Sequence, residues 1–187
     1  MYPSRIVISI PEARLKSILD KDSWFISEVE KTTGTKITVK KETGEITIDV
    51  SKNSKQSDII RAREMIQAYG HGFDPNDALR LRNSDVFMEI INLKDYLSSS
   101  NDIIRVKGRI IGAGGKTKST IIELTGASIS ISDNEIVIIG DFEQLQVAKR
   151  AIEMLINGSP HTVVYRFLER FKSAQKIKSL KSLGGDT

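Results

Sequence analysis

Hydrophobic and polar residues alternate in short runs in two parts of the chain. Ile37 and Val39 alternate with polar neighbours, as do Ile129 and Ile131, and this period of two is typical of a half-buried strand. Further β-rich runs occupy residues 5–10, 45–50, 86–91 and 135–140. The pattern therefore predicts two groups of three strands.

Helical spacing of hydrophobic residues fills the intervals between these strands. Leu145, Ala148 and Ile152 recur on one face, which predicts a helix over residues 142–157. The other predicted helices cover residues 12–19, 24–33, 102–111 and 116–125, a stretch around Glu64, and a last segment with Ser159 as N-cap and Pro160 in its first turn. Gly34 and Gly126 stand where left-handed helix C-caps are expected.

These elements form two copies of one small domain. The segment Lys31–Val39 matches Glu123–Ile131, and each segment is followed by a second strand and a helix. The predicted fold class is α+β, with two β-α-α-β-β-α units in tandem, each a three-stranded antiparallel sheet with helices on one face, and a C-terminal helix. Turn residues cluster near 70–76, so we predict a first unit over residues 1–73 and a second over 74–187.

Composition and charge restrict the chemistry available to the chain. Its 187 residues are 39% hydrophobic and 28% charged, with a net charge of +4, as in an ordinary folded protein. The chain has no cysteine, and His71 and His161 match no metal or triad spacing. We therefore expect no metal, no cofactor and no enzyme activity. No signal peptide or apolar stretch of membrane-spanning length is evident, so we expect a cytoplasmic protein with no membrane partner.

The most specific motif is a glycine loop between the predicted helices 102–111 and 116–125. It reads Gly112-Ala113-Gly114-Gly115, and small residues let a sugar-phosphate backbone approach closely. The N–H groups and the dipole at the start of the following helix favour an anion. Positions 105–118 hold five basic residues and no acidic residue, namely Arg105, Lys107, Arg109, Lys116 and Lys118. Ile110 and Ile111 lie either in the core or in a groove against which bases pack.

This loop and its surroundings resemble a known class of nucleic-acid-binding domain. Ile111-Gly-Ala-Gly-Gly-Lys116, inside a β-α-α-β-β-α unit, resembles the G-x-x-G loop of a KH domain, which clamps about four nucleotides of a single strand. Together with residues 123–126, 147–158 and 165–170, it makes the chain similar to the tandem-KH ribosome-maturation proteins of archaea and eukaryotes, the Dim-two or partner-of-Nob-one group related to Krr-one.

The resemblance implies two KH type I-like units and binding of single-stranded RNA near the 3′ end of the small-subunit rRNA during ribosome assembly. We predict RNA contacts from Ile111 and from the loop Gly112, Ala113, Gly114 and Gly115. Lys116 and Lys118 are predicted as phosphate partners, and Arg105, Lys107 and Arg109 as flanking cations.

The first copy departs from this motif. Asp20, Lys21, Asp22 and Ser23 align with the glycine loop, so two carboxylates stand where phosphates would lie and no glycine remains. We therefore expect the first unit to bind RNA weakly or not at all. Its expected role is to pack against the second unit or to contact a ribosome-assembly or translation-initiation protein. Trp24 is expected to fill the core or an inter-domain contact.

Two other functions remain open on the sequence. Gly115-Lys116-Thr117 matches the end of the P-loop pattern G-x-x-x-x-G-K-[ST], although Ile110 replaces its first glycine. A nucleotide-binding protein and a protein-interaction scaffold are therefore the alternatives. The segment 166–181 has six basic residues and one acidic residue, and is either a solvated helix face or an additional RNA contact. An apolar stripe on its first turns is expected to dock this helix on the body of the protein, namely Val163, Val164, Phe167, Leu168 and Phe171.

Overall fold

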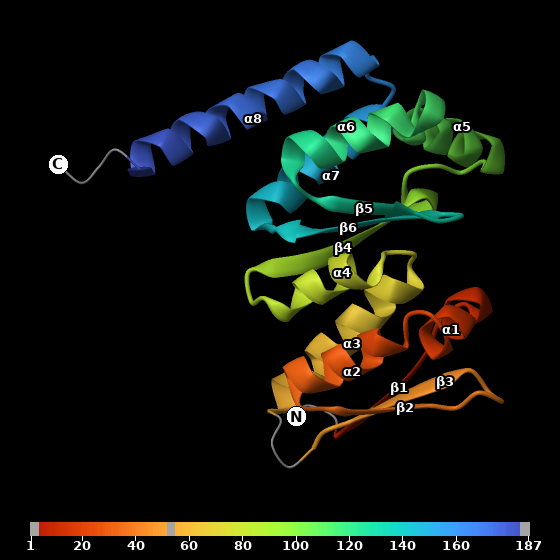
Figure 1. Ribbon diagram of the computed structural model, residues 1–187. Helices are drawn as coiled ribbons and strands as arrows, with labels where there is room; N and C mark the ends of the chain where they lie inside the picture. Colours follow the sequence, from red (N-terminus) through yellow and green to blue (C-terminus); the bar gives the residue numbers. More distant parts are fainter. Residues whose placement is uncertain (1–3, 52–54, 184–187) are drawn as a thin grey trace. The chain divides into compact units, whose positions relative to one another are not determined.

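The structure is a computed structural model that describes residues 4–51 and 55–183 (Figure 1). It divides into two units, Met1–Met88 and Glu89–Thr187. Each unit contains helices and one three-stranded antiparallel sheet. The predicted α+β class is therefore confirmed.

The first unit places its last strand at the centre of the sheet. In chain order its main elements are β1 (Arg5–Ser9), α1 (Glu12–Leu19), α2 (Ser23–Thr33), β2 (Lys36–Val39), β3 (Glu45–Asp49) and α3 (Gln56–Gly70). β3 pairs antiparallel with both β1 and β2, so that Ile48 lies opposite both Ile6 and Ile37. Ile46 and Ile48 are fully buried because the helices cover one face of this sheet (Figure 1).

The second unit repeats this arrangement. Its first strand, β4 (Val86–Asn92), begins three residues before the unit boundary at Glu89. The other main elements are α5 (Ser100–Ile111), α6 (Lys116–Thr125), β5 (Ser128–Ile131), β6 (Glu135–Asp141) and α7 (Phe142–Ile156). β6 lies between β4 and β5. Ile103, Val106 and Ile110 recur at helical spacing on α5 and are buried in one hydrophobic core with Ile121 of α6.

The first unit extends beyond the boundary at residue 73 that the turn residues predicted. A short helix, α4 (Pro75–Leu79), and a 3₁₀ turn over Arg80–Arg82 follow α3 and belong to the first unit. Leu79 and Leu81 are buried, and the Arg61 guanidinium of α3 donates to the Leu81 carbonyl at 2.9 Å. A helix of five residues is too short to produce a periodic pattern, so the sequence did not reveal it.

Glycine ends the second helix of each unit, as predicted. Gly34 and Gly126 have φ of 66° and 76°, which is the left-handed region. The Gly34 N–H donates to the Glu30 carbonyl at 2.7 Å, and the Gly126 N–H donates to the Ile122 carbonyl at 2.8 Å. Both predicted C-caps are therefore confirmed.

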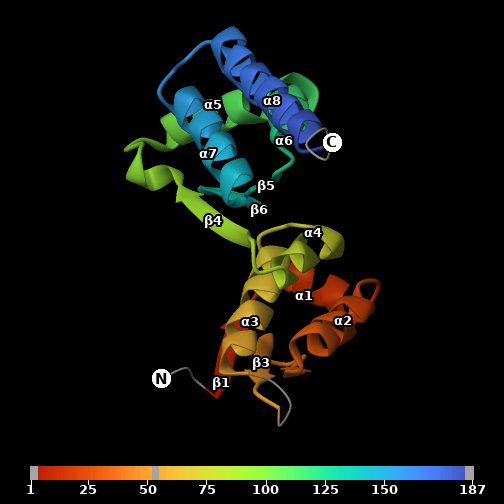
Figure 2. The same ribbon diagram turned by 90° about the vertical axis from the view of Figure 1, so that its left-hand side faces the viewer.

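The last helix, α8 (His161–Leu183), lies outside the repeated elements and packs on α6 and α7 (Figure 2). It begins one residue after the predicted start, and the Pro160 carbonyl accepts hydrogen bonds from the N–H groups of Val163 and Val164. Val164 and Leu168 are buried in the core of the unit and Phe167 packs against it, which confirms the predicted docking for these residues. Val163 is 43% exposed, so its place in the docking stripe was predicted wrongly. Farther along, Ile177 is 56% exposed.

Of the two expectations for Trp24, the structure contradicts the one that places it in the core. It stands at the start of α2 and is 46% exposed, so it does not fill the core. The buried aromatic residue of this helix is its neighbour Phe25, which stacks on Tyr69 of α3 with ring centroids 5.1 Å apart. Among the helices of residues 4–51 and 55–183, none is long and apolar enough to cross a membrane.

Candidate nucleic-acid interface

Gly112 ends helix α5 in a conformation that only glycine adopts readily. Its φ and ψ are 75° and 170°, a region that is essentially restricted to glycine. A Cβ atom at this position would lie 2.2 Å from Thr117 Oγ1 and 2.7 Å from the Thr117 backbone nitrogen. The close approach of α5 to the start of α6 therefore requires glycine here.

The next three residues form an exposed 3₁₀ turn, Ala113–Gly115, that leads into α6. Gly114 and Gly115 have left-handed φ of 58° and 80°, and a Cβ atom on either residue would meet nothing within 4 Å. Within residues 4–51 and 55–183, the N–H groups of Ala113 and Gly114 donate to no acceptor. The turn therefore leaves open space and two unpaired donors at the N-terminus of a helix, which favours binding of an anion.

Two predicted phosphate partners lie on the first turn of α6. Lys116 is exposed and Lys118 is half-buried, and neither forms an ion pair within the described part of the chain. Arg105 of α5 is also exposed, and its guanidinium lies 3.0 Å from the carboxylate of Asp102. An exposed pair of this kind contributes little to stability, so Arg105 can exchange its partner for a phosphate at small cost.

The structure holds the other two predicted cations in place with backbone carbonyls. The Lys107 ammonium donates to the Asp133 carbonyl at 3.1 Å. The Arg109 guanidinium donates to the Leu155 carbonyl at 2.8 Å and to the Ser159 carbonyl at 2.5 Å. Arg109 therefore fastens the end of α7 to the connection that precedes α8, which sequence spacing could not indicate.

The two isoleucines before the turn have different surroundings. Ile110 is fully buried and belongs to the core, whereas Ile111 is 37% exposed. Ile104, which the sequence reasoning missed, is 68% exposed on the same helix. Ile104, Gly108 and Ile111 follow one another at intervals of four and three residues, so they share one face of α5. This apolar face is available for packing of bases.

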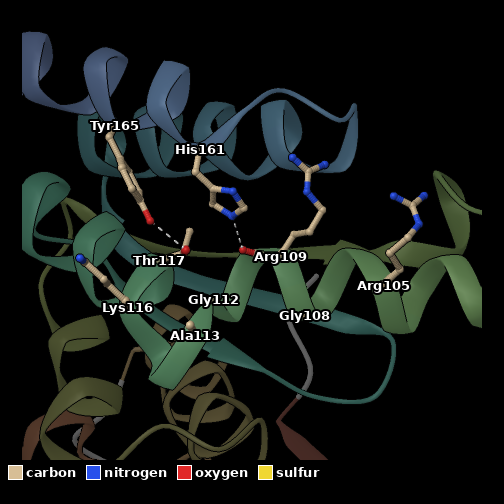
Figure 3. Close-up of a pocket in the computed structure, with 9 residues that line it drawn as sticks. All are labelled: Arg105, Gly108, Arg109, Gly112, Ala113, Lys116, Thr117, His161 and Tyr165. Atoms are coloured by element: carbon tan, nitrogen blue, oxygen red, sulfur yellow. Dashed lines mark hydrogen bonds between the residues drawn. The ribbon is translucent and has the colours of Figure 1, made fainter.

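A cavity of about 440 Å³ lies between this turn and α8 (Figure 3). Its lining combines cations, hydroxyl groups and small residues, and consists of Arg105, Gly108, Arg109, Gly112, Ala113, Lys116, Thr117, His161 and Tyr165. Thr117 Oγ1 and the Tyr165 hydroxyl are hydrogen-bonded at 2.9 Å, and His161 Nε2 lies 2.9 Å from the Arg109 carbonyl oxygen. Sequence reasoning assigned no ligand contact to His161 or Tyr165, because α8 reaches the turn only through tertiary packing.

The equivalent turn of the first unit is tied to its core. The Tyr69 hydroxyl donates to the Asp22 carboxylate at 2.6 Å, and burial followed by this hydrogen bond raises the pKa of Tyr69 to about 12. The Arg14 guanidinium lies 3.8 Å over the Tyr69 ring. The N–H groups of Asp20 and Asp22 both donate to the Ser17 carbonyl.

The nucleotide-binding alternative does not fit this geometry. A P-loop connects a strand to a helix, whereas the turn Gly112–Gly115 follows helix α5. Among the residues that the structure describes, no group of three or more His, Asp or Glu side chains could hold a metal ion.

Known proteins match this architecture. A family model described as the eukaryotic type KH domain, KH-domain type I, matches residues 87–173. A KH domain-containing protein of Methanocaldococcus jannaschii is 38% identical over 92% of this chain and 75% of its own length. The chain belongs to the PNO1/Dim2 family of KH-domain proteins.

Two further relatives connect this family with RNA. The pre-rRNA-processing protein PNO1 of Candida albicans is 36% identical over 74% of this chain and 49% of its own length. Dim2p of Pyrococcus horikoshii, in a crystal structure with a/eIF2alpha and rRNA, is 42% identical, with a TM-score of 0.80 over 91% of this chain and 94% of Dim2p. The chain thus spans about half the length of the eukaryotic PNO1 protein it matches.

Proposed function

We propose that this PNO1/Dim2 family member binds single-stranded RNA through its second unit and acts in the maturation of small-subunit rRNA. The observation that carries the proposal is the turn Gly112–Gly115, where two N–H groups have no acceptor among the described residues and a side chain at Gly114 or Gly115 would meet no obstacle. The rRNA in the crystal structure of Dim2p from Pyrococcus horikoshii supports the choice of ligand.

The chemistry of the turn accounts for the binding of a nucleic-acid backbone. A phosphate can accept hydrogen bonds from the N–H groups of Ala113 and Gly114 while the positive end of the α6 dipole favours its charge. Lys116 and Lys118 supply cations that no acidic partner neutralises within the described residues. The apolar face Ile104–Gly108–Ile111 gives the bases a surface on which to pack. The proposal includes no catalytic step.

The two units have different proposed roles in a tandem KH type I arrangement. The first unit has the same order of strands and helices, but its turn carries Asp20 and Asp22. These carboxylates repel a phosphate backbone. We therefore assign the first unit to contacts with a protein, and the presence of a/eIF2alpha in the Dim2p complex supports a translation-initiation factor as the type of partner.

The test is to place negative charge on the open side of the turn. The double variant Ala113→Asp with Gly114→Asp should weaken binding to a short single-stranded RNA about 100-fold or more, since like charges at a contact cost several kcal/mol. Neither side chain meets a core residue, so far-UV circular dichroism should stay the same. Fluorescence anisotropy with a labelled oligonucleotide measures the dissociation constant.

A matched control adds the same two charges elsewhere. Thr38→Asp with Thr43→Asp alters two exposed positions of the first unit and should leave RNA affinity within about twofold, because screened charges at a distance have little effect. Equal losses in both double variants, or no loss in either, would contradict the assignment to the turn. Crosslinking to total RNA should recover fragments from the 3′ region of the small-subunit rRNA.

A further inference from the structure

We propose that a small pocket beside α4 in the first unit binds a single carboxylate side chain, Asp or Glu, of a protein partner. This arginine pocket has a volume of about 240 Å³ and is lined by Asn76, Leu79, Arg80, Arg82 and Asn83. The inference rests on the protein-contact role proposed for the first unit, and it names the chemistry of that contact. The lining residues all belong to the first unit, so the pocket is separate from the turn Gly112–Gly115.

The segment that carries the arginine pocket is an addition to the repeated elements. Helix α4 and the 3₁₀ turn Arg80–Arg82 follow α3, the last helix of the β-α-α-β-β-α order, and α4 packs on α3 (Figure 1). Leu79 and Leu81 are buried and anchor the segment. Arg80 and Arg82 alternate with these leucines, and their side chains are half-buried and exposed. The alternation therefore presents two guanidinium groups at the surface.

Arg61 of α3 prepares this backbone for an anion. Its guanidinium nitrogen Nη1 donates to the carbonyls of Leu81, Arg82 and Asn83 at 2.9, 3.1 and 2.8 Å. Carbonyls at the end of a helical turn carry partial negative charge, which would repel an anion. The bonds to Arg61 compensate this charge and hold the segment in one conformation. Arg61 is therefore a positioning residue for the arginine pocket.

The two arginines of the pocket can both turn to a ligand. Within the described part of the chain, the exposed Arg82 guanidinium forms no hydrogen bond or ion pair. The Arg80 guanidinium lies 4.0 Å from the Asp77 carboxylate, a separation at which an ion pair near the surface is weak. A planar guanidinium matches the two oxygens of a carboxylate. The carboxamides of Asn76 and Asn83 supply further N–H donors.

The charges next to the pocket favour one isolated carboxylate over a nucleic-acid backbone. Residues 74–85 contain two arginines and three acidic residues, Asp74, Asp77 and Asp85. A nucleic-acid strand carries a charge at every linkage, so phosphates beside the bound one would be repelled by these acids. No glycine and no aromatic residue lines the pocket, so neither close approach of a sugar-phosphate backbone nor base stacking is provided for. The geometry therefore points to a protein segment with a lone Asp or Glu.

The test is a titration of the full ¹⁵N-labelled chain followed by NMR. The probe is an eight-residue Gly/Ser peptide with blocked ends and one central Glu, and the matched peptide has Gln in its place. The Glu peptide should shift the Arg82 Nε–H and Asn83 carboxamide signals with a dissociation constant on the order of 1 mM. The Gln peptide should bind about 10-fold more weakly, because a neutral amide loses the charge-assisted hydrogen bonds.

The Arg82→Gln variant should remove the preference for the charged peptide. Its affinity for the Glu peptide should fall about 10-fold, to the level of the Gln peptide, since the two changes remove the same contact. The matched control is Arg5→Gln, which removes the same charge from a side chain of the first unit that is 67% exposed and pairs with Asp49. This control should stay within about twofold of wild type, because a distant exposed charge is screened.

The Asp77→Asn variant should bind the Glu peptide more tightly. The Asp77 carboxylate competes with the ligand for Arg80, so its loss should strengthen binding about 3-fold. A variant that only loosened the fold would not gain affinity. Asp20→Asn removes the same charge from an exposed position of the first unit and should leave the affinity unchanged.

Three outcomes would overturn the inference. Equal binding of the Glu and Gln peptides would show that the pocket does not recognise a carboxylate, and equal affinities of Arg82→Gln and wild type would place the contact elsewhere. RNA is tested on the variant with Ala113→Asp and Gly114→Asp: an RNA oligomer that shifts the Arg82 signal there would replace the protein partner. Failure of RNA binding at the second unit is distinguishable, because it would leave the peptide titrations unaffected.

Discussion

The turns Asp20–Ser23 and Gly112–Gly115 occupy equivalent places between two helices, but their polar groups have different partners. In the first unit, the Asp22 carboxylate accepts a hydrogen bond from the buried Tyr69. Among the described residues only glycines have a positive φ, so no residue of the turn Asp20–Ser23 adopts the left-handed conformation of Gly114 and Gly115. In the second unit, the N–H groups of Ala113 and Gly114 remain without acceptors in the described chain. A turn that satisfies its own polar groups stabilises the fold, whereas a turn that leaves them open at the surface can bind a ligand.

The sharpest test of the second turn compares two of its glycines. Gly112→Ala should lower the free energy of unfolding of the second unit by about 2–4 kcal/mol, because the new Cβ clashes with Thr117 and the backbone conformation excludes other residues. Gly114→Ala meets open space and should cost about 1 kcal/mol for its left-handed conformation. Urea denaturation followed by circular dichroism measures both. Equal costs would show that the contact with Thr117 has no effect on stability.

At high pH the turn Asp20–Ser23 should lose the hydrogen bond between the Tyr69 hydroxyl and the Asp22 carboxylate. The pKa of Tyr69 is raised to about 12, chiefly by burial, whereas an unfolded tyrosine titrates near about 10. Below pH 10 the phenol keeps its proton in both states. Between about pH 10 and 12 only the unfolded chain releases the proton, so the stability of the first unit should fall by about 3 kcal/mol in total. Tyr69→Phe should remove this part of the decline in a pH series of denaturation curves.

A smaller effect is expected from the acceptor of that hydrogen bond. Asp22→Ala leaves the buried Tyr69 hydroxyl without its partner and should destabilise the first unit by about 1–3 kcal/mol. The adjacent exposed Asp20 provides the control, and Asp20→Ala should change stability by less than about 0.5 kcal/mol. RNA affinity should be the same for both variants. A loss of affinity in Asp22→Ala alone would mean that the first turn also takes part in binding.

The smallest effect concerns single lysines at the two turns. Lys118→Gln should weaken RNA binding about 3-fold and reduce the salt dependence by about one released counterion. Lys21→Gln removes the same charge from the first turn and should change neither quantity. Titrations at several salt concentrations measure the RNA affinity and its salt dependence. Equal losses of affinity in Lys118→Gln and Lys21→Gln would contradict the functional difference between the two units.

The spacing of hydrophobic residues along the chain and the residues typical of turns were sufficient to predict most of the fold. The strand around Ile37 alternates between buried and exposed residues as predicted. The prediction of a half-buried strand around Ile129 is wrong, because Ser128 and Ser130 are buried together with Ile129. Gly34 and Gly126 were recognisable because a left-handed C-cap demands glycine. The helix α4 (Pro75–Leu79) was missed because five residues span little more than one helical turn.

The site was predictable from the sequence only where its residues lie in one continuous segment of the chain. Gly112 to Gly115 and the neighbouring lysines lie within one continuous segment, so their combination is visible in the sequence. The direction of the Lys107 and Arg109 side chains depends on carbonyls of Asp133 and Leu155, which folding brings near from distant parts of the chain. The cavity was not visible for the same reason, since His161 and Tyr165 arrive with α8.

Because Gly112 lies against Thr117, substitutions in the turn and in the last helix depend on one another. Thr117 occupies the space that any side chain at position 112 would need, and its hydroxyl is also the partner of Tyr165. A lineage that replaced Gly112 would have to replace Thr117 as well, and Tyr165 would then lose its hydrogen bond. Relatives should therefore keep or change these three positions together.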